Sequence, residues 1–267
     1  MQKERRKEGK KGIMAGFEIL NQSENEITIA IDKTTPAFVN AVRRTAVFDV
    51  PVLAIEDVYF TKNSSALYDE IIAHRLGLVP LKTDPKSYNL PEDCTCKGKL
   101  CAKCSVKIIL KAKGPATVYS GDMKFKDPAI KAVHAQIPIV KLLEGQEIEL
   151  EAIAILGKGK VHAKWSPCHA WHRGGPEFTF TKEADAKAVL DKIPGDVVRK
   201  DGRSIEVKDF GKWTDAYEQM LRGAGVEVKN SETRFILYLE SWGQLKPAEI
   251  LTQAVGILQS KVKEAKI

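Results

Sequence analysis

Residues 34–60, TTPAFVNAVRRTAVFDVPVLAIEDVYF, contain a helix start, an amphipathic helix and a strand in direct succession. Two threonines before Pro36 are typical of an N-cap followed by the first helical position. The helix is expected from Ala37 to about Phe48, and the alternating pattern of residues 52–60 predicts a strand. A helix that leads directly into a strand indicates an α+β chain.

This predicted helix has two chemically different faces. The apolar face carries Phe38, Val42 and Thr45 or Ala46. The polar face carries Asn40, Arg43 and Arg44. An amphipathic pattern of this kind predicts that one face packs against apolar surface and that the other stays accessible.

Working outward, the same patterns predict further elements on both sides. Strands are expected within 16–31 around a polar turn, and at 105–111, 146–156 and 232–240; helices are expected at 68–76, 182–192, 212–223 and from Pro247 onward. Residues 128–144 remain ambiguous because Pro138 argues against a long helix. The last helix carries a stripe that needs a partner surface, in this chain or in another subunit: Ile250, Leu251, Ala254, Ile257, Leu258 and Val262.

Composition indicates an ordinary globular protein. The 267 residues are 43% hydrophobic and 29% charged, which argues against intrinsic disorder. No apolar run is long enough to span a membrane and no secretory signal is visible, so we expect a cytoplasmic protein. Residues 1–13 alone carry a net +4 of the overall +7, which makes the charge weak support for nucleic-acid binding by the folded part.

Four of the five cysteines, Cys94, Cys96, Cys101 and Cys104, fall on one short loop. Clustered thiolates match a tetrahedral metal such as zinc, which closes its coordination shell with four sulfurs. Disulfides, free thiols or another soft metal remain alternatives. A closed site of this kind is expected to be structural, since no position is left for substrate.

Other chemistry-bearing residues form no recognisable enzyme motif. His162, Cys168, His169 and His172 lie close in sequence, but their spacing fits no common zinc pattern, so we interpret them as core and surface residues. The pairs Glu56-Asp57 and Asp69-Glu70 are interpreted as loop and helix-end charges. Phosphate-binding loops, dinucleotide fingerprints and hydrolase motifs are absent from the sequence.

Several stretches resemble the α-type subunits of RNA polymerase. They are NAVRRT at 40–45, YDEIIAHRLGLVPL at 68–81 and FILYLESWGQLKPAEILTQAVGIL at 235–258. The cysteine loop and HAKWSP at 162–167 are similar to the archaeal and eukaryotic branch of this family, which includes the third-largest subunit of polymerase II. The resemblance extends from about residue 16 to 262.

The resemblance implies a discontinuous architecture. Residues 14–51 and 229–267 would form a dimerisation domain, preceded by a flexible basic tail at 1–13. Residues 52–172 would form an inserted β-rich domain that carries the cysteine loop. A small ferredoxin-like insertion would occupy residues 173–228. Several archaeal relatives hold an iron–sulfur cluster there, but these residues include no cysteine, so no such cluster is expected.

The resemblance also implies partners. The smaller subunit L would cover the interface residues Phe38, Ile250, Leu251, Ala254, Ile257 and Leu258. The face with Asn40, Arg43 and Arg44 would dock onto the large catalytic subunits, with small zinc-bearing subunits nearby and DNA reached only through the complex. The expected function is therefore a non-catalytic assembly platform of a nucleotidyltransferase. Two other classes stay open, namely a free-standing zinc-dependent nucleic-acid binder and a thiol redox protein.

Overall fold

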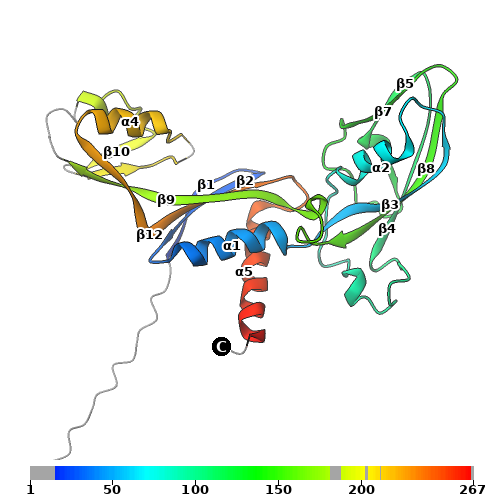
Figure 1. Ribbon diagram of the computed structural model, residues 1–267, viewed down its shortest axis with the longest axis horizontal. Coiled ribbons are helices and arrows are strands. Elements are labelled where there is room, and N and C mark those ends of the chain that lie inside the picture. Colours follow the sequence, from blue (N-terminus) through cyan, green and yellow to red (C-terminus); the bar gives the residue numbers. More distant parts are fainter. Residues whose placement is uncertain (1–15, 181–187, 202–203, 211, 266–267) are drawn as a thin grey trace, which may run out of the picture. The chain divides into compact units, whose positions relative to one another are not determined.

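The computed structural model describes residues 16–180, 188–201, 204–210 and 212–265. It is a mixed α+β chain with antiparallel strand pairs, which confirms the predicted fold class (Figure 1). The described residues divide into two compact units, each built from segments far apart in sequence. The first unit comprises 16–21, 28–39 and 172–237, and the second comprises 22–27, 40–171 and 238–265.

A four-stranded sheet follows the order β1-β2-β12-β9. Its strands are β1 (Gly16–Gln22), β2 (Glu26–Asp32), β12 (Val226–Ser241) and β9 (Cys168–Phe180). The polar turn between the first two is closed by Ser23, whose hydroxyl accepts a hydrogen bond from the Glu26 N–H at 3.1 Å. The predicted strands at 16–31 and 232–240 are confirmed. The predicted domain borders at 172/173 and 228/229 fall inside long strands, and that domain assignment stays a prediction.

Helix α1 (Pro36–Phe48) begins where its capping residues predicted. The Thr35 hydroxyl accepts a hydrogen bond from the Phe38 N–H at 3.3 Å, as expected of an N-cap. The buried stripe of the helix runs through Val39, Val42 and Ala46, while Phe38 is 38% exposed. The stripe therefore includes Val39, which the sequence analysis did not assign to the apolar face.

The second unit holds another four-stranded sheet with the order β3-β8-β4-β6. Its strands are β3 (Val52–Asn63), β8 (Glu147–Gly157), β4 (Ser105–Lys113) and β6 (Lys124–Phe125). Alternate residues of β8 are buried, from Ile148 to Leu156, so one face of the sheet belongs to the core. The predicted strands at 52–60, 105–111 and 146–156 are confirmed.

Further elements complete this unit. Helix α2 (Asp69–Gly77) packs on β3 and β7 and buries Ile72 and Leu76 (Figure 1). The ambiguous stretch 128–144 contains a strand that begins at Pro138. The remaining elements are β5 (Ala116–Tyr119), β7 (Pro138–Leu142), α5 (Pro247–Glu264) and the short 3-10 helices Pro91–Asp93, Ser120–Asp122 and Ala163–Trp165.

The first unit contains a small module beyond its sheet strands. It includes the hairpin β10 (Val198–Asp201) with β11 (Ser204–Val207), and helix α4 (Asp215–Gly223). Trp213 contacts two other aromatic residues of this module. Its ring centroid lies 5.7 Å from that of Phe178 and 5.9 Å from that of Tyr217. The predicted helix at 212–223 is confirmed from residue 215. Of the helix predicted at 182–192, residues 188–190 are helical and residues 182–187 lie outside the described part. The tail at 1–13 also lies outside it.

No helix in the described segments is both long and apolar enough to cross a membrane.

Trp165 packs directly on the backbone of Gly157 at the end of β8. The indole N–H donates a hydrogen bond to the Ile155 carbonyl at 3.2 Å, and the residue is buried. A Cβ atom at position 157 would lie 2.3 Å from the indole ring, well inside contact distance. Glycine is therefore required here by the close approach of a rigid side chain.

We predict that Gly157→Ala lowers the free energy of unfolding by about 1–3 kcal/mol, because the buried indole must shift. Chemical denaturation monitored by tryptophan fluorescence measures this. Gly256→Ala is the matched control, since its added Cβ would meet no atom within 4 Å. The control should be neutral or stabilising by up to about 1 kcal/mol. Equal effects of the two substitutions would contradict the packing argument.

Candidate metal centre and assembly surfaces

The cysteine loop lies between the 3-10 helix Pro91–Asp93 and strand β4. Tight turns shape it, with the Cys94 carbonyl accepting from the Lys97 N–H at 3.0 Å and the Cys101 carbonyl accepting from the Cys104 N–H at 3.0 Å. Lys97 and Leu100 have φ values of 52° and 50°, in the left-handed region that side chains disfavour. Such local strain is typical of a segment whose shape is held by a ligand or by function.

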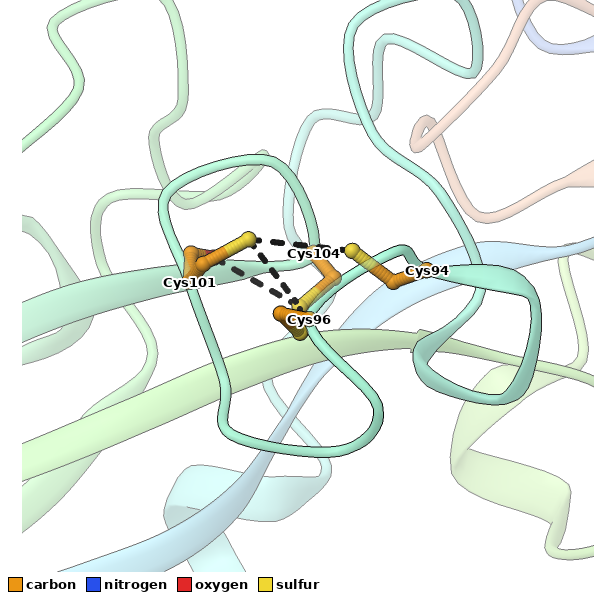
Figure 2. Close-up of side chains that lie close together, drawn as sticks. All are labelled: Cys94, Cys96, Cys101 and Cys104. Carbon is orange, nitrogen blue, oxygen red and sulfur yellow. Dashed lines mark hydrogen bonds between the residues drawn. The ribbon is translucent and has the colours of Figure 1, made fainter.

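These turns bring the four predicted ligands together (Figure 2). All four sulfurs lie within 4.8 Å of one another. The Sγ–Sγ distances are 3.7 Å for Cys94–Cys101, 3.6 Å for Cys96–Cys104 and 3.9 Å for Cys101–Cys104. A tetrahedral zinc with bonds of about 2.3 Å places its sulfurs about 3.8 Å apart. The sulfurs therefore fit a single tetrahedral metal such as zinc, and all five cysteines are free of disulfides.

The thiols differ in acidity. Burial raises the pKa of Cys104 to about 12, whereas a hydrogen bond with the backbone of Cys101 lowers the pKa of Cys96 to about 6. A metal ligand must be a thiolate, so binding has to release the Cys104 proton at neutral pH. Metal affinity should therefore fall as the pH falls.

The three histidines of the cluster each have a different neighbour, and the interpretation that they form no second metal site stays a prediction. His162 accepts a hydrogen bond from the Lys164 N–H, His169 lies against Trp171, and His172 lies against Phe235. Cys168 is buried, which raises its pKa to about 12 and makes its thiol a poor nucleophile.

The paired carboxylates have structural contacts. Glu56 pairs with the Lys164 ammonium, which also donates to the Ile55 carbonyl at 3.0 Å. Asp69 accepts a hydrogen bond from the Asn63 amide at 2.7 Å, at the start of helix α2. Glu56 and Asp57 lie within strand β3, so their interpretation as loop charges was wrong, whereas Asp69 and Glu70 lie in the first turn of helix α2 as interpreted.

The predicted docking residues lie on the accessible side of α1. Arg43 donates to the Asn40 side-chain oxygen through Nε at 3.1 Å and through Nη2 at 2.9 Å. Its Nη1 also reaches the Ala170 carbonyl at 3.5 Å. Arg44, one position further, is exposed. Arg43 is thus held in a fixed orientation, and Arg44 is open to a partner.

The predicted interface stripe of α5 is covered only in part. Ile250 and Ala254 are fully buried, while Leu251, Ile257 and Leu258 are half-buried. Val262 is 53% exposed. The chain therefore covers the start of the stripe and leaves apolar surface available further along the helix.

Comparison with known proteins decides the family. A family model of the RNA polymerase Rpb3/RpoA insert domain matches residues 58–168. The DNA-directed RNA polymerase subunit Rpo3 of Methanothermobacter thermautotrophicus is 36% identical over 250 residues, 91% of this chain and 94% of that protein. The chain belongs to the Rpo3 family. Rpo3 of Archaeoglobus fulgidus is 33% identical over 94% of this chain and 97% of its own length. Rpo3 of Pyrococcus horikoshii is 34% identical over 93% of this chain and 95% of its own length.

The insert-domain match places the cysteine loop of this Rpo3-family chain inside that domain. Sequence reasoning had not identified the contacts that Lys164 and Trp165 make, nor the hydrogen bond from Arg75 to the Ile139 carbonyl at 2.9 Å. The family motifs at 68–81 and 162–167 could have pointed to these contacts, because the first contains Arg75 and the second contains Lys164 and Trp165. Their role in packing became visible only with their distant partners.

We predict that Cys104→Ser abolishes stable metal binding, because three remaining thiolates leave the shell incomplete. Elemental analysis with thiol titration should show about one metal per chain in the unsubstituted protein and far less in the variant. Cys168→Ser is the control and should retain all of the metal. Unchanged metal content in the Cys104 variant would rule out this site.

Proposed function

We propose that this chain is the α-type subunit of an archaeal DNA-directed RNA polymerase, a non-catalytic platform that pairs with subunit L. The observation that carries the proposal is the identity of 33–36% to Rpo3 subunits over about nine-tenths of the chain. The half-covered stripe of α5 supports it independently. So does the lack of an enzyme motif in the sequence.

The proposed mechanism is burial of apolar helix faces against subunit L. Leu251, Ile257 and Leu258 would lose their remaining exposure on pairing, and Phe38 of α1 would contribute its exposed ring. Obligate interfaces commonly bury on the order of 2,000 Å² or more. An interface of that size would join the pair before larger subunits are added.

The docking and metal assignments belong to the same proposal. Asn40, Arg43 and Arg44 would bind the large catalytic subunits, since a guanidinium offers rigid bidentate donors. Small zinc-bearing subunits would pack nearby, and DNA would be reached only through the complex. Zinc would hold the cysteine loop, because the sulfur spacing suits it. The predicted domain boundaries and the cluster-free insertion at 173–228 are part of this proposal.

We predict that Leu258→Asp weakens pairing with subunit L by at least about a hundredfold, because a carboxylate would be buried without a partner. Co-expression followed by size-exclusion chromatography and calorimetric titration measures this. The isolated chain should keep its thermal unfolding midpoint, since position 258 is only half-buried.

Gln259→Asp is the matched control on the exposed side of α5 and should pair normally. Should the unsubstituted chain stay a well-behaved monomer in the presence of subunit L, the platform function is wrong. A monomer that binds DNA with a steep salt dependence would favour the free-standing nucleic-acid binder instead.

We also predict that Arg44→Ala leaves the pair with subunit L intact and weakens recruitment of the large subunits about tenfold, by loss of charge-assisted hydrogen bonds. Stepwise reconstitution with pull-down of the large subunits measures it. Arg44→Lys should restore only part of the binding, because lysine lacks the bidentate fork. Loss of the pair itself would show that this face has been misassigned.

A further inference from the structure

A cavity of about 630 Å³ lies within the second unit, at the start of helix α5. Three segments far apart in sequence form its wall: the turn between β1 and β2 at 24–25, the loop 82–86, and residues 243–253 around the start of α5. Its volume lies in the range of about 300–1,000 Å³ that is typical of small-molecule sites. None of the residues proposed above for pairing, docking or metal binding lines it.

Hydrogen bonds join the three segments of the wall. The Thr83 N–H donates to the Gln244 carbonyl at 3.0 Å, which holds the loop 82–86 against the start of α5. The Ser241 N–H donates to the Asn25 carbonyl at 2.7 Å, which holds the β1–β2 turn there as well. The Gly243 N–H donates to the Ser241 hydroxyl at 2.9 Å. The cavity is therefore formed by the fold itself, before any ligand binds.

The cavity offers groups that bind a phosphate. Lys82, Lys86 and Lys246 line it, and none of their ammonium groups forms an ion pair within the described part of the chain. Helix α5 begins at Pro247, which has no N–H, and the next N–H, that of Ala248, has no acceptor among the described residues. A free N–H at a helix N-terminus and nearby ammonium groups both favour an anion.

The cavity also offers acceptors. Glu249 accepts a hydrogen bond from the Lys246 N–H at 3.1 Å, and Asp84 accepts one from the Lys86 N–H at 2.9 Å. Both carboxylates are thus positioned by backbone donors, which leaves the lysine ammonium groups to a ligand. Glu24 is the third carboxylate of the lining. Because a carboxylate can accept several hydrogen bonds, these groups can also bind hydroxyls of a ligand.

Gln244 supplies the independent sign of a missing ligand group. The residue lines the cavity and is only 4% exposed, and its side-chain oxygen is buried without a hydrogen-bond partner. Native proteins pair the large majority of their buried polar atoms, so an unpaired oxygen in a cavity wall indicates an absent donor. The terminal torsion of glutamine is soft, and a small rotation turns the amide toward a hydroxyl seated in the cavity.

The mixture of groups selects the class of ligand. Three lysines and three carboxylates line the cavity, so a ligand with an anionic part and a part rich in donors satisfies both sets, whereas a bare anion or cation satisfies only one. None of the described lining residues is aromatic, so a nucleobase would find no ring to stack on. Inorganic phosphate would leave the Gln244 oxygen without a donor.

We propose that this cavity binds a small sugar phosphate. Its phosphate lies among Lys82, Lys86, Lys246 and the Ala248 N–H, and its hydroxyls donate to the Gln244 amide oxygen and to the carboxylates. This binding site goes beyond the proposed platform function and does not depend on it.

The test is calorimetric titration of the full-length chain with ribose 5-phosphate at low ionic strength. One molecule should bind per chain, and ribose or inorganic phosphate alone should each bind at least about tenfold more weakly. Lys82→Gln should lower the affinity for ribose 5-phosphate about tenfold, by loss of a charge-assisted contact. Lys131→Gln is the matched control and should bind normally, because Lys131 is an exposed lysine outside the cavity whose carbonyl accepts from the Lys82 N–H at 2.8 Å.

A second variant tests the buried amide. Gln244→Met keeps the length of the side chain and removes the oxygen, so it should lower the affinity for ribose 5-phosphate about tenfold and leave that for inorganic phosphate unchanged. Without ligand it should raise the thermal unfolding midpoint, because an unpaired buried oxygen is lost.

Several results would overturn the proposal: no binding of ribose 5-phosphate, equal binding of inorganic phosphate (an adventitious ion only), tighter binding of adenosine monophosphate, or an affinity unchanged by Lys82→Gln. Because Lys82 is exposed, its variant tests the site even where Gln244→Met does not fold. Pairing with subunit L is measured on the same preparations, so failure of the platform function is seen separately.

Discussion

The pairing of β8 with both β3 and β4 is the interaction on which the second unit depends. A buried apolar cluster of that unit is built on the sheet that these three strands form. The buried alternation of β8 supplies one face to the core, and α2 packs on β3 against that core. The cysteine loop leads directly into β4, so a bound metal would fix the loop beside the same sheet. Its contribution is local order, while the larger stabilisation comes from apolar burial.

The residues with reactive side chains are different from the residues proposed to bind other subunits. Within the described residues, four cysteine sulfurs lie close enough together to hold one metal ion, and a metal bound by all four would leave no position for substrate. The surfaces proposed for assembly use ordinary groups instead, namely half-covered aliphatic side chains on α5 and guanidinium groups on α1. Such surfaces need no activated residue, because association depends on shape, apolar area and complementary charge. This distribution is what a platform within a larger enzyme requires.

Much of the fold was predictable from local patterns. Thr35 and Pro36 marked the start of α1, and period-two alternation marked β4 and β8. The four metal-ligating candidates were also predictable, since the turns that bring them together are short. Features that depend on contacts between residues far apart in sequence were not predictable from local patterns. Strand β7 begins at a proline and β6 has two residues, so neither shows a local pattern. The contact between Lys164 and Glu56 joins residues 108 positions apart.

The packing of Trp165 on Gly157 has an evolutionary consequence. Because the indole ring occupies the space that any side chain at position 157 would need, a larger residue there lowers stability while the tryptophan remains. A smaller residue at 165 would open the space first and make a change at 157 tolerable. The order of substitutions is therefore constrained, and relatives in which position 157 has a side chain should have lost the tryptophan earlier in their descent.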